Sequence, residues 1–232
     1  MDFAFGYSTQ AAVSKVVLAN GGKVVGSTLF PQNTADFASV ILQAVASKAK
    51  VVCLIASGTD NINALKQAEE FGLRAQGATI TVPLLWITDV HALGLPLAQG
   101  LTFIEPFYWD RTEETRAWTK RFLARHSTVP NGTQAAAYSS VLHYLKAVAA
   151  VGNTDAHPVI EQMRNTRVND FFARDGWIRE DMRLMHDFYL ARVKSPAASK
   201  GQWDYYENIE TIPAEAAFGT LAESACPLVK KG

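Results

Sequence analysis

Residues 51–73 read VVCLIASGTDNINALKQAEEFGL and contain a strand, a loop and a helix in that order. Val51 to Ala56 is a continuous apolar run, typical of a strand that is buried on both faces of a parallel sheet. After it, apolar side chains recur at helical spacing, at Ile62, Leu65, Ala68 and Phe71. Thr59 and Asp60 are residue types that cap the start of a helix, and Gly72 stands where a left-handed residue ends one. The loop at 57–60 therefore lies at the carboxyl end of a parallel strand, the edge at which open α/β sheets bind ligands.

The same alternation extends to both sides of this stretch. Further strands are predicted at 23–30, 78–85 and 101–106, and further helices at 13–20, 37–45 and 87–95. Alternating strands and helices call for parallel βαβ units with right-handed crossovers. The first part of the chain is therefore expected to form one α/β lobe.

The pattern changes after residue 106. Helices are predicted at 112–126, 134–151 and 155–165, a β-hairpin over 177–193, linker composition at 195–202 and a short helix led by Pro213. The helix at 134–151 aligns Tyr138, Val141, Leu142, Leu145 and Val148, and this stripe is expected to face the core.

Composition narrows the class of ligand. The chain has 232 residues, 48% of them hydrophobic, so it can bury a substantial core. Lys plus Arg and Asp plus Glu number 22 each, so no global field favours nucleic acid, and a small neutral or zwitterionic ligand is expected. No apolar run is long enough to span a membrane, and the opening residues lack the layout of an export signal.

The common signatures of enzymes and metal sites are missing from the sequence. There is no nucleophile elbow, no phosphate-binding loop and no dinucleotide fingerprint. Cys53 and Cys226 do not have a metal or redox spacing, and neither do the five histidines. Asp89 and His91 follow a predicted strand, and two interpretations compete: an acid/base pair, or a helix-capping or ligand-contacting Asp beside a surface His. We expect no catalytic residue, no metal and no cofactor.

Six stretches together resemble the substrate-binding proteins of ABC importers for branched-chain and other hydrophobic amino acids. They lie at Asp2 to Gly6 (DFAFG), Phe30 to Val52, Ile62 to Leu73, Ile87 to Gly94 (ITDVHALG), Phe107 to His126 (FYWDRTEETRAWTKRFLARH) and Ala135 to Val148. The resemblance runs along essentially the whole chain and keeps the order of the family.

The resemblance implies the type I periplasmic binding protein fold, with two α/β lobes joined by three crossing segments and a cleft that closes by a hinge motion. Residues 1–106 would form the second lobe, 107–196 the later part of the first lobe, and 197–232 the return to the second lobe. A complete member begins earlier, with an export signal and the opening βαβ units of the first lobe. The chain therefore resembles an N-terminally truncated member.

The resemblance also implies a set of ligand contacts. Phe5 matches an aromatic residue of the cleft, and the amides at the start of the helix after 57–60 could hold an anionic group. Thr88 and Asp89 lie near an acidic contact to the ligand ammonium, and Tyr138 would face the cleft from the other lobe. The predicted ligand-binding residues are Phe5, Ser57, Gly58, Thr59, Asp60, Thr88, Asp89 and Tyr138.

The function implied is the non-catalytic, solute-binding component of an ABC importer, which captures an amino acid or a related hydrophobic or aromatic carboxylate. Its expected partners are that small molecule and an ABC permease, with no nucleic acid and no direct membrane insertion, and the full-length protein is expected in the periplasm. One alternative is a ligand-sensing domain of the same fold, and a less favoured one is an α/β hydrolase or transferase that uses Asp89 or His91. Because half of a two-sided cleft lacks polar partners worth about 1–3 kcal/mol each, this chain alone is expected to bind ligand weakly and to expose apolar surface.

Overall fold

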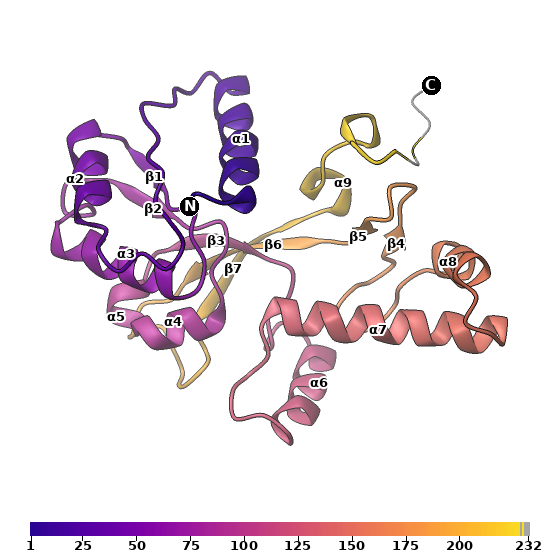
Figure 1. Cartoon of the computed structure of the whole chain (residues 1–232). Helices are drawn as coiled ribbons and strands as arrows, with labels where there is room; N and C mark the ends of the chain where they lie inside the picture. The colour runs from indigo at the N-terminus through magenta and orange to yellow at the C-terminus, as the bar shows by residue number, and fades with distance from the viewer. Residues whose placement is uncertain (228, 230–232) are drawn as a thin grey trace. The chain divides into compact units, whose positions relative to one another are not determined.

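The computed structural model describes residues 1–227 and 229, and it divides into two compact units (Figure 1). The first unit comprises Met1–Ile104 and Ala191–Glu207, and the second comprises Glu105–Leu190 and the chain from Asn208 on. The chain thus passes between the units three times, after Ile104, Leu190 and Glu207. The assignment of residues 1–106, 107–196 and 197–232 to particular lobes stays a prediction.

The main sheet has five strands in the order β1-β2-β3-β6-β7. They are β1 (Val51–Cys53), β2 (Thr79–Thr81), β3 (Thr102–Glu105), β6 (Phe188–Val193) and β7 (Tyr206–Ile212). β1 pairs with β2 in parallel and β2 with β3 in parallel. The expected parallel βαβ arrangement is therefore confirmed for the central stretch, although the strands are shorter than the apolar runs that predicted them.

The helices of the first unit follow the predicted order. They are α1 (Ala4–Ala19), α2 (Ala38–Ser47), α3 (Thr59–Glu70), α4 (Ile87–Leu93) and α5 (Leu95–Ala98). Gly72 follows the end of α3 with φ +68°, as predicted for a left-handed helix terminus. The predicted N-cap of α3 is wrong, because Gly58 occupies that position and Thr59 and Asp60 lie inside the first turn.

The predicted strand at 23–30 does not form. A strand needs backbone partners on a neighbouring strand, which local β-propensity cannot supply. Phe30, at the end of this segment, is nevertheless buried, and its ring meets that of Phe37 edge-on with the centroids 4.9 Å apart. The segment is thus anchored to the core at its carboxyl end.

The second unit is built mainly from helices. They are α6 (Glu113–Leu123), α7 (Gly132–Val151), α8 (Ala156–Asn165), α9 (Ala214–Ala217) and the 3₁₀ helix η1 (Leu221–Glu223). The side chain of Thr112 caps α6 by accepting a hydrogen bond of 3.2 Å from the amide of Thr115. The side chain of Asn131 caps α7 in the same way, with a bond of 2.9 Å from the amide of Gln134. These caps explain why both helices begin where they do.

The predicted hairpin over 177–193 is only partly correct. β4 (Trp177–Ile178) pairs antiparallel with β5 (Leu184–Met185), whereas the rest of the run leaves the hairpin as β6 and joins the main sheet. The predicted single strand is broken at His186 and Asp187. Pairing with a strand that is distant in sequence therefore overrides the local hairpin pattern.

The core of the second unit is aromatic. The rings of Trp118 and Phe171 stack with their centroids 4.1 Å apart, and Phe107 meets Trp118 edge-on at 5.6 Å. Trp118 and Phe107 are both buried, together with Ala135 of α7. α6 and α7 are thereby joined through one aromatic cluster.

The predicted core face of α7 is wrong. Its buried residues are the small or polar ones, Gly132, Ala135, Ser139, His143 and Ala147, whereas Val141 and Leu145 are 57% and 53% exposed. A side chain on Gly132 would collide with Pro106 and Glu105 at 2.8–2.9 Å, so the small face permits a close approach that larger residues would prevent. Within the predicted stripe, Val141 and Leu145 consequently face away from the unit's core, whereas Tyr138 meets the core residue Trp118 edge-on.

Candidate functional site

The segment 57–60 lies at the carboxyl edge of the sheet, as predicted, where Ser57 and Gly58 end the loop after β1 and Thr59 and Asp60 begin α3. Gly58 has φ +54° and ψ −127°, a conformation that glycine adopts far more readily than other residues. The first helical hydrogen bond runs from the amide of Ile62 to the carbonyl of Gly58, over 3.2 Å. The turn made possible by this glycine therefore sets the start of α3.

The start of α3 presents backbone N–H groups that intrahelical bonding leaves unused. No side chain of the described residues caps the helix at Gly58. Ser57 and Gly58 are half-buried and Thr59 is exposed, so the loop remains within reach of a small molecule. Such a terminus favours an anionic group through its amides and through the helix dipole.

Asp60 plays a structural part in this loop. It is only 5% exposed, and its Oδ2 accepts the amide of Asn33 over 3.1 Å, which ties the turn at 31–34 to α3. Its charge also lies in the first helical turn, where it complements the helix dipole. A ligand contact by this carboxylate stays a prediction.

Asn61 is a residue of this edge that the sequence analysis missed. Its side chain is fully buried, and its Nδ2 donates to the carbonyl of Leu84 over 2.6 Å, which connects the start of α3 to the loop after β2. Its Oδ1 is buried without a hydrogen-bond partner among the described residues. No sequence signal distinguishes this Asn from an exposed polar residue of a first helical turn.

Thr88 and Asp89 lie in the first turn of α4, beyond Leu84. α3 and α4 pack against each other, so both predicted loops lie on one part of the first unit. Asp89 is 6% exposed, and its Oδ2 accepts the amide of Trp86 over 3.2 Å. Burial raises the pKa of this carboxyl, and the hydrogen bond from Trp86 opposes the rise. Asp89 therefore caps α4, as one interpretation expected, but the expected N-cap position is wrong, because Trp86 occupies it and Asp89 is the third helical residue.

His91 does not pair with Asp89. Its Nδ1 shares a hydrogen bond of 2.7 Å with the hydroxyl of Tyr205, and its ring stacks on Trp203 with the centroids 4.2 Å apart. The two residues thus have separate partners, and the acid/base interpretation of Asp89 and His91 is wrong.

The two predicted aromatic contacts lie in different units. Phe5 is half-buried on α1, in the first unit. Tyr138 lies on α7 in the second unit, is 38% exposed, and accepts a hydrogen bond from Nη2 of Arg121 over 3.1 Å. Its ring meets Trp118 edge-on with the centroids 5.5 Å apart. Each ring is thus accessible within its own unit, and a role in binding stays a prediction for both.

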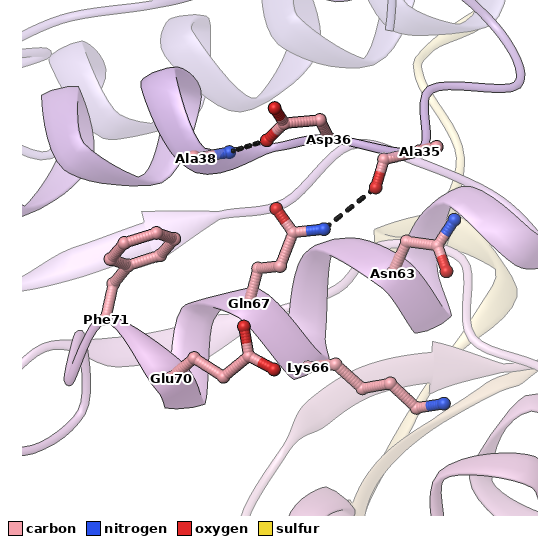
Figure 2. A pocket seen from close by; sticks show the side chains of 8 residues that line it. All are labelled: Ala35, Asp36, Ala38, Asn63, Lys66, Gln67, Glu70 and Phe71. Carbon is pink, nitrogen blue, oxygen red and sulfur yellow. Dashed lines mark hydrogen bonds between the residues drawn. The ribbon is translucent and has the colours of Figure 1, made fainter.

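The first unit also has a surface hollow of about 390 Å³ between the entry to α2 and one side of α3, shown in Figure 2. Its lining residues are Ala35, Asp36, Ala38, Asn63, Lys66, Gln67, Glu70 and Phe71. The amide of Gln67 is already used, since its Nε2 donates to Ala35 over 2.8 Å and its Oε1 accepts from Phe37 over 2.6 Å. This hollow contains none of the predicted ligand-binding residues, and its central polar group serves the fold.

Within residues 1–227 and 229, no group of three His, Cys, Asp or Glu side chains is placed to hold a metal ion. In that same part of the chain, no helix combines the length and the apolar character needed to cross a membrane. Cys53 and Cys226 are both free, and burial raises the pKa of the Cys53 thiol.

Comparison with known proteins agrees with the fold and with the predicted resemblance. A family model described as "Periplasmic binding protein" matches residues 1–202. The solved structure of a periplasmic binding protein from Burkholderia mallei is 44% identical, with a TM-score of 0.93 over 99% of this chain and 60% of that one. A branched chain amino acid ABC transporter periplasmic ligand-binding protein from Burkholderia xenovorans LB400 is 41% identical, with a TM-score of 0.88 over 98% of this chain and 61% of that one.

A third solved structure is more distant. A solute binding protein from R. palustris, in complex with 4-hydroxybenzoate, is 20% identical, with a TM-score of 0.81 over 91% of this chain and 58% of that one. At this identity the likeness concerns the fold alone. No curated protein matches the chain. The chain spans about 60% of the length of the solved relatives.

Proposed function

Because the chain belongs to the periplasmic binding protein family, we propose that it forms part of the non-catalytic, solute-binding component of an ABC importer. The observation that carries this proposal is the match to a periplasmic binding protein at 44% identity over 99% of this chain. A permease partner and a periplasmic location of the full-length protein belong to the same proposal. They are supported by the relative from Burkholderia xenovorans LB400, which is a periplasmic ligand-binding protein of an ABC transporter.

The proposed ligand is an amino acid or a related hydrophobic or aromatic carboxylate. One relative is described as a branched chain amino acid ligand-binding protein, and the distant one holds 4-hydroxybenzoate. Both ligand classes combine a carboxylate with an apolar body. A site for them needs anion-binding donors together with apolar contacts.

The start of α3 supplies the proposed anion-binding donors. Its unused amides follow the turn at Ser57 and Gly58, and Thr59, the first residue of the helix, is exposed. Thr88 and Asp89 would supply a second polar contact, because the bond to Trp86 uses only Oδ2 of the carboxylate. Asp89 would then favour a ligand ammonium when it is ionised.

Apolar contacts are proposed for the two aromatic residues. Phe5 would contribute from the first unit and Tyr138 from the second. The same proposal assigns each unit to a lobe of the family fold. The first unit corresponds to the second lobe, and the second unit corresponds to the later part of the first lobe. A closing cleft would then combine contacts from both lobes.

Calorimetric measurement of ligand binding tests the proposal. The protein to use is a longer one that contains this chain and matches the length of its relatives. The panel would contain leucine, isoleucine, valine, benzoate and 4-hydroxybenzoate, with glycerol as a neutral control. We expect saturable binding of at least one carboxylate. Absence of heat and of any thermal shift with every carboxylate would contradict the proposed ligand class.

A paired substitution tests the donors at the start of α3. Thr59→Pro removes one N–H at the first helical position, where proline is tolerated. We expect it to weaken carboxylate binding by about tenfold, since a hydrogen bond to a charged group contributes roughly 1.5–3 kcal/mol. Ala156→Pro, at the first position of α8, is the matched control and should leave affinity unchanged. Equal affinities for both variants would place the carboxylate elsewhere.

A further inference from the structure

His186 lies in an aromatic cage of the second unit. Its ring stacks on Phe188 with the centroids 4.8 Å apart, and Phe172 approaches it to 4.9 Å. Phe218 meets the His186 ring edge-on at 5.6 Å and the Phe188 ring edge-on at 5.5 Å. His186 is only 9% exposed. A titratable imidazole is therefore enclosed by the rings of Phe172, Phe188 and Phe218, which we call the His186 cage.

The cage favours the neutral form of the imidazole. Nδ1 of His186 lies 2.9 Å from the carbonyl of Asp187, and a carbonyl only accepts, so Nδ1 carries a hydrogen. Nε2 is then the nitrogen that takes up a proton when the ring becomes charged. Burial lowers the pKa of His186, while the bond to the Asp187 carbonyl and the charge of the Asp187 carboxylate oppose this change. Protonation inside the cage thus costs more free energy than protonation in water.

One wall of the cage belongs to residues 213–224, which we call the strap. The strap contains α9, labelled in Figure 1. The amide of Ala214 donates to Oδ1 of Asp187 over 3.2 Å, and Nη1 of Arg179 donates to the carbonyl of Gly219 over 2.8 Å. The strap is thus attached to the rest of the second unit by polar contacts as well as by the cage.

The strap follows a passage of the chain between the units. β7 begins in the first unit, and the chain enters the second unit at Asn208 and reaches the strap directly after Ile212. His186 stands shortly before Leu190, where the chain leaves the second unit. Attachment of the strap therefore fixes, within the second unit, the end of a strand that passes between the units.

Most charged groups on the elements around the cage have partners of their own or are exposed. Nε and Nη2 of Arg179 donate to Asp181 over 2.9 and 2.8 Å, and Asp170 accepts from the amide of Phe172 over 2.8 Å. The exposed charged residues of these elements are Arg174, Asp175, Glu180, Glu215 and Glu223.

Two charges of opposite sign act at the cage itself. The Asp187 carboxylate favours protonation of His186 but does not outweigh burial. The guanidinium of Arg183 lies over the ring of Phe218, 5.6 Å from its centroid. A positive charge on His186 would therefore add to that of Arg183 beside the same ring, and like charges repel.

We propose that residues 213–224 form an acid-released latch, in which protonation of His186 weakens the docking of the strap on the second unit. Once Phe218 leaves the cage, water hydrates the imidazolium, so the undocked form binds a proton more readily than the docked form. Docking is therefore strongest above the ordinary histidine pKa of about 6.5, and it weakens as the pH falls below that value. The latch does not depend on which ligand the protein binds.

Hydrogen exchange of the strap amides at two pH values tests the latch. We expect protection of the Ala214 and Phe218 amides, each normalised to the unfolded chain at the same pH, to fall about threefold or more between about pH 7.5 and about pH 5.5. The amide of Ala135, buried in α7, should change less. His186→Phe keeps an aromatic ring in the cage but cannot be protonated, so it should abolish the pH dependence at the strap. His126→Phe is the matched control, because His126 also stacks on a phenylalanine but is exposed.

A second measurement does not require the His186 variant to fold. Because docking and protonation are linked, removal of the Phe218 ring by Phe218→Ala should make His186 easier to protonate. The titration of the His186 ring, followed by NMR, should move to higher pH in this variant. Phe122→Ala removes the ring stacked on His126 and is the control, which should leave the titration of His186 unchanged.

Equal protection of the strap amides at both pH values in the parent chain would overturn the proposal. So would the same pH dependence in His186→Phe as in the parent chain. A loss of protection at Ala135 as large as that in the strap would also overturn it, because the whole unit would then loosen together. An identical titration of His186 with and without the ring of Phe218 would contradict the latch equally.

Discussion

Nδ2 of Asn61 donates to the carbonyl of Leu84 over 2.6 Å, so the start of α3 is fastened to the loop that follows β2. This bond connects the two segments that carry most of the predicted ligand contacts. Asn61 has no exposed surface, and Leu84 is half-buried. The stability of the sheet edge and the geometry of the candidate site therefore depend on the same side chain.

Asn61→Ala is expected to lower the free energy of unfolding by about 0.5–1.5 kcal/mol, because it removes the hydrogen bond to the carbonyl of the half-buried Leu84. Urea unfolding followed by circular dichroism measures the change. Asn63→Ala is the matched control: its side chain is half-buried and donates to Thr34 over a longer 3.3 Å, so a smaller loss is expected. Equal losses of unfolding free energy in the two variants would show that the bond to Leu84 contributes no more than the bond to Thr34.

Gly58→Ala should destabilise the protein by about 1–2 kcal/mol through backbone strain alone. Gly58 has φ +54°, while a Cβ there would meet no atom within 4 Å, so steric overlap contributes nothing. Gly26→Ala is the control, because its Cβ is equally free and its φ is not positive. Chemical denaturation compares the two, and a neutral Gly58→Ala would mean that the loop relaxes to another conformation.

Asp89→Asn tests the buried carboxyl through its pH dependence. The folded-state pKa is raised above 3.8, so the native state binds more protons than the unfolded state between these two values. The free energy of unfolding should therefore fall as the pH rises through this window, and the lost stability should stay lost above it. Asn keeps an oxygen that can accept from Trp86 but carries no charge.

The variant is thus expected to be at least as stable as the parent chain at neutral pH. The difference in free energy of unfolding between the two proteins should shrink as the pH falls toward about 4. Thermal unfolding over a pH series measures this difference. Parallel pH profiles for the two proteins would contradict a raised pKa at Asp89.

In the longer protein, the same variant should weaken the binding of ligands that carry an ammonium group and leave the binding of benzoate unchanged.

Trp118→Ala is expected to cost about 3–5 kcal/mol, because it removes a buried ring that stacks on Phe171 at 4.1 Å. Val141→Ala is the informative comparison, since the sequence pattern placed Val141 in the core and the structure leaves it 57% exposed. Its effect should stay within about 0.5 kcal/mol. A large loss at Val141 would show that this face of α7 is covered in solution.

Local sequence signals determined the elements whose stability depends on neighbouring residues. The apolar run at Val51, the helical spacing of α3 and the glycine after it predicted a strand, a helix and a helix terminus at the observed places. The order of the family-like stretches likewise predicted the fold that the solved relatives share. Periodicity and turn chemistry act over a few residues, and a single sequence displays them directly.

Tertiary structure alone decided which partners those elements have. The segment 23–30 has the composition of a strand but forms none, because strands are made by hydrogen bonds to segments distant in sequence. The buried face of α7 is the small one: a Cβ at Gly132 would collide with Pro106, whereas Val141 is 57% exposed. Asp60 was predicted as a helix cap and Asn61 was not singled out, yet the folded chain gives both residues partners distant in sequence, Asn33 and Leu84. The reason is physical: burial and pairing are properties of contacts, and contacts between distant residues exist only once the chain has folded.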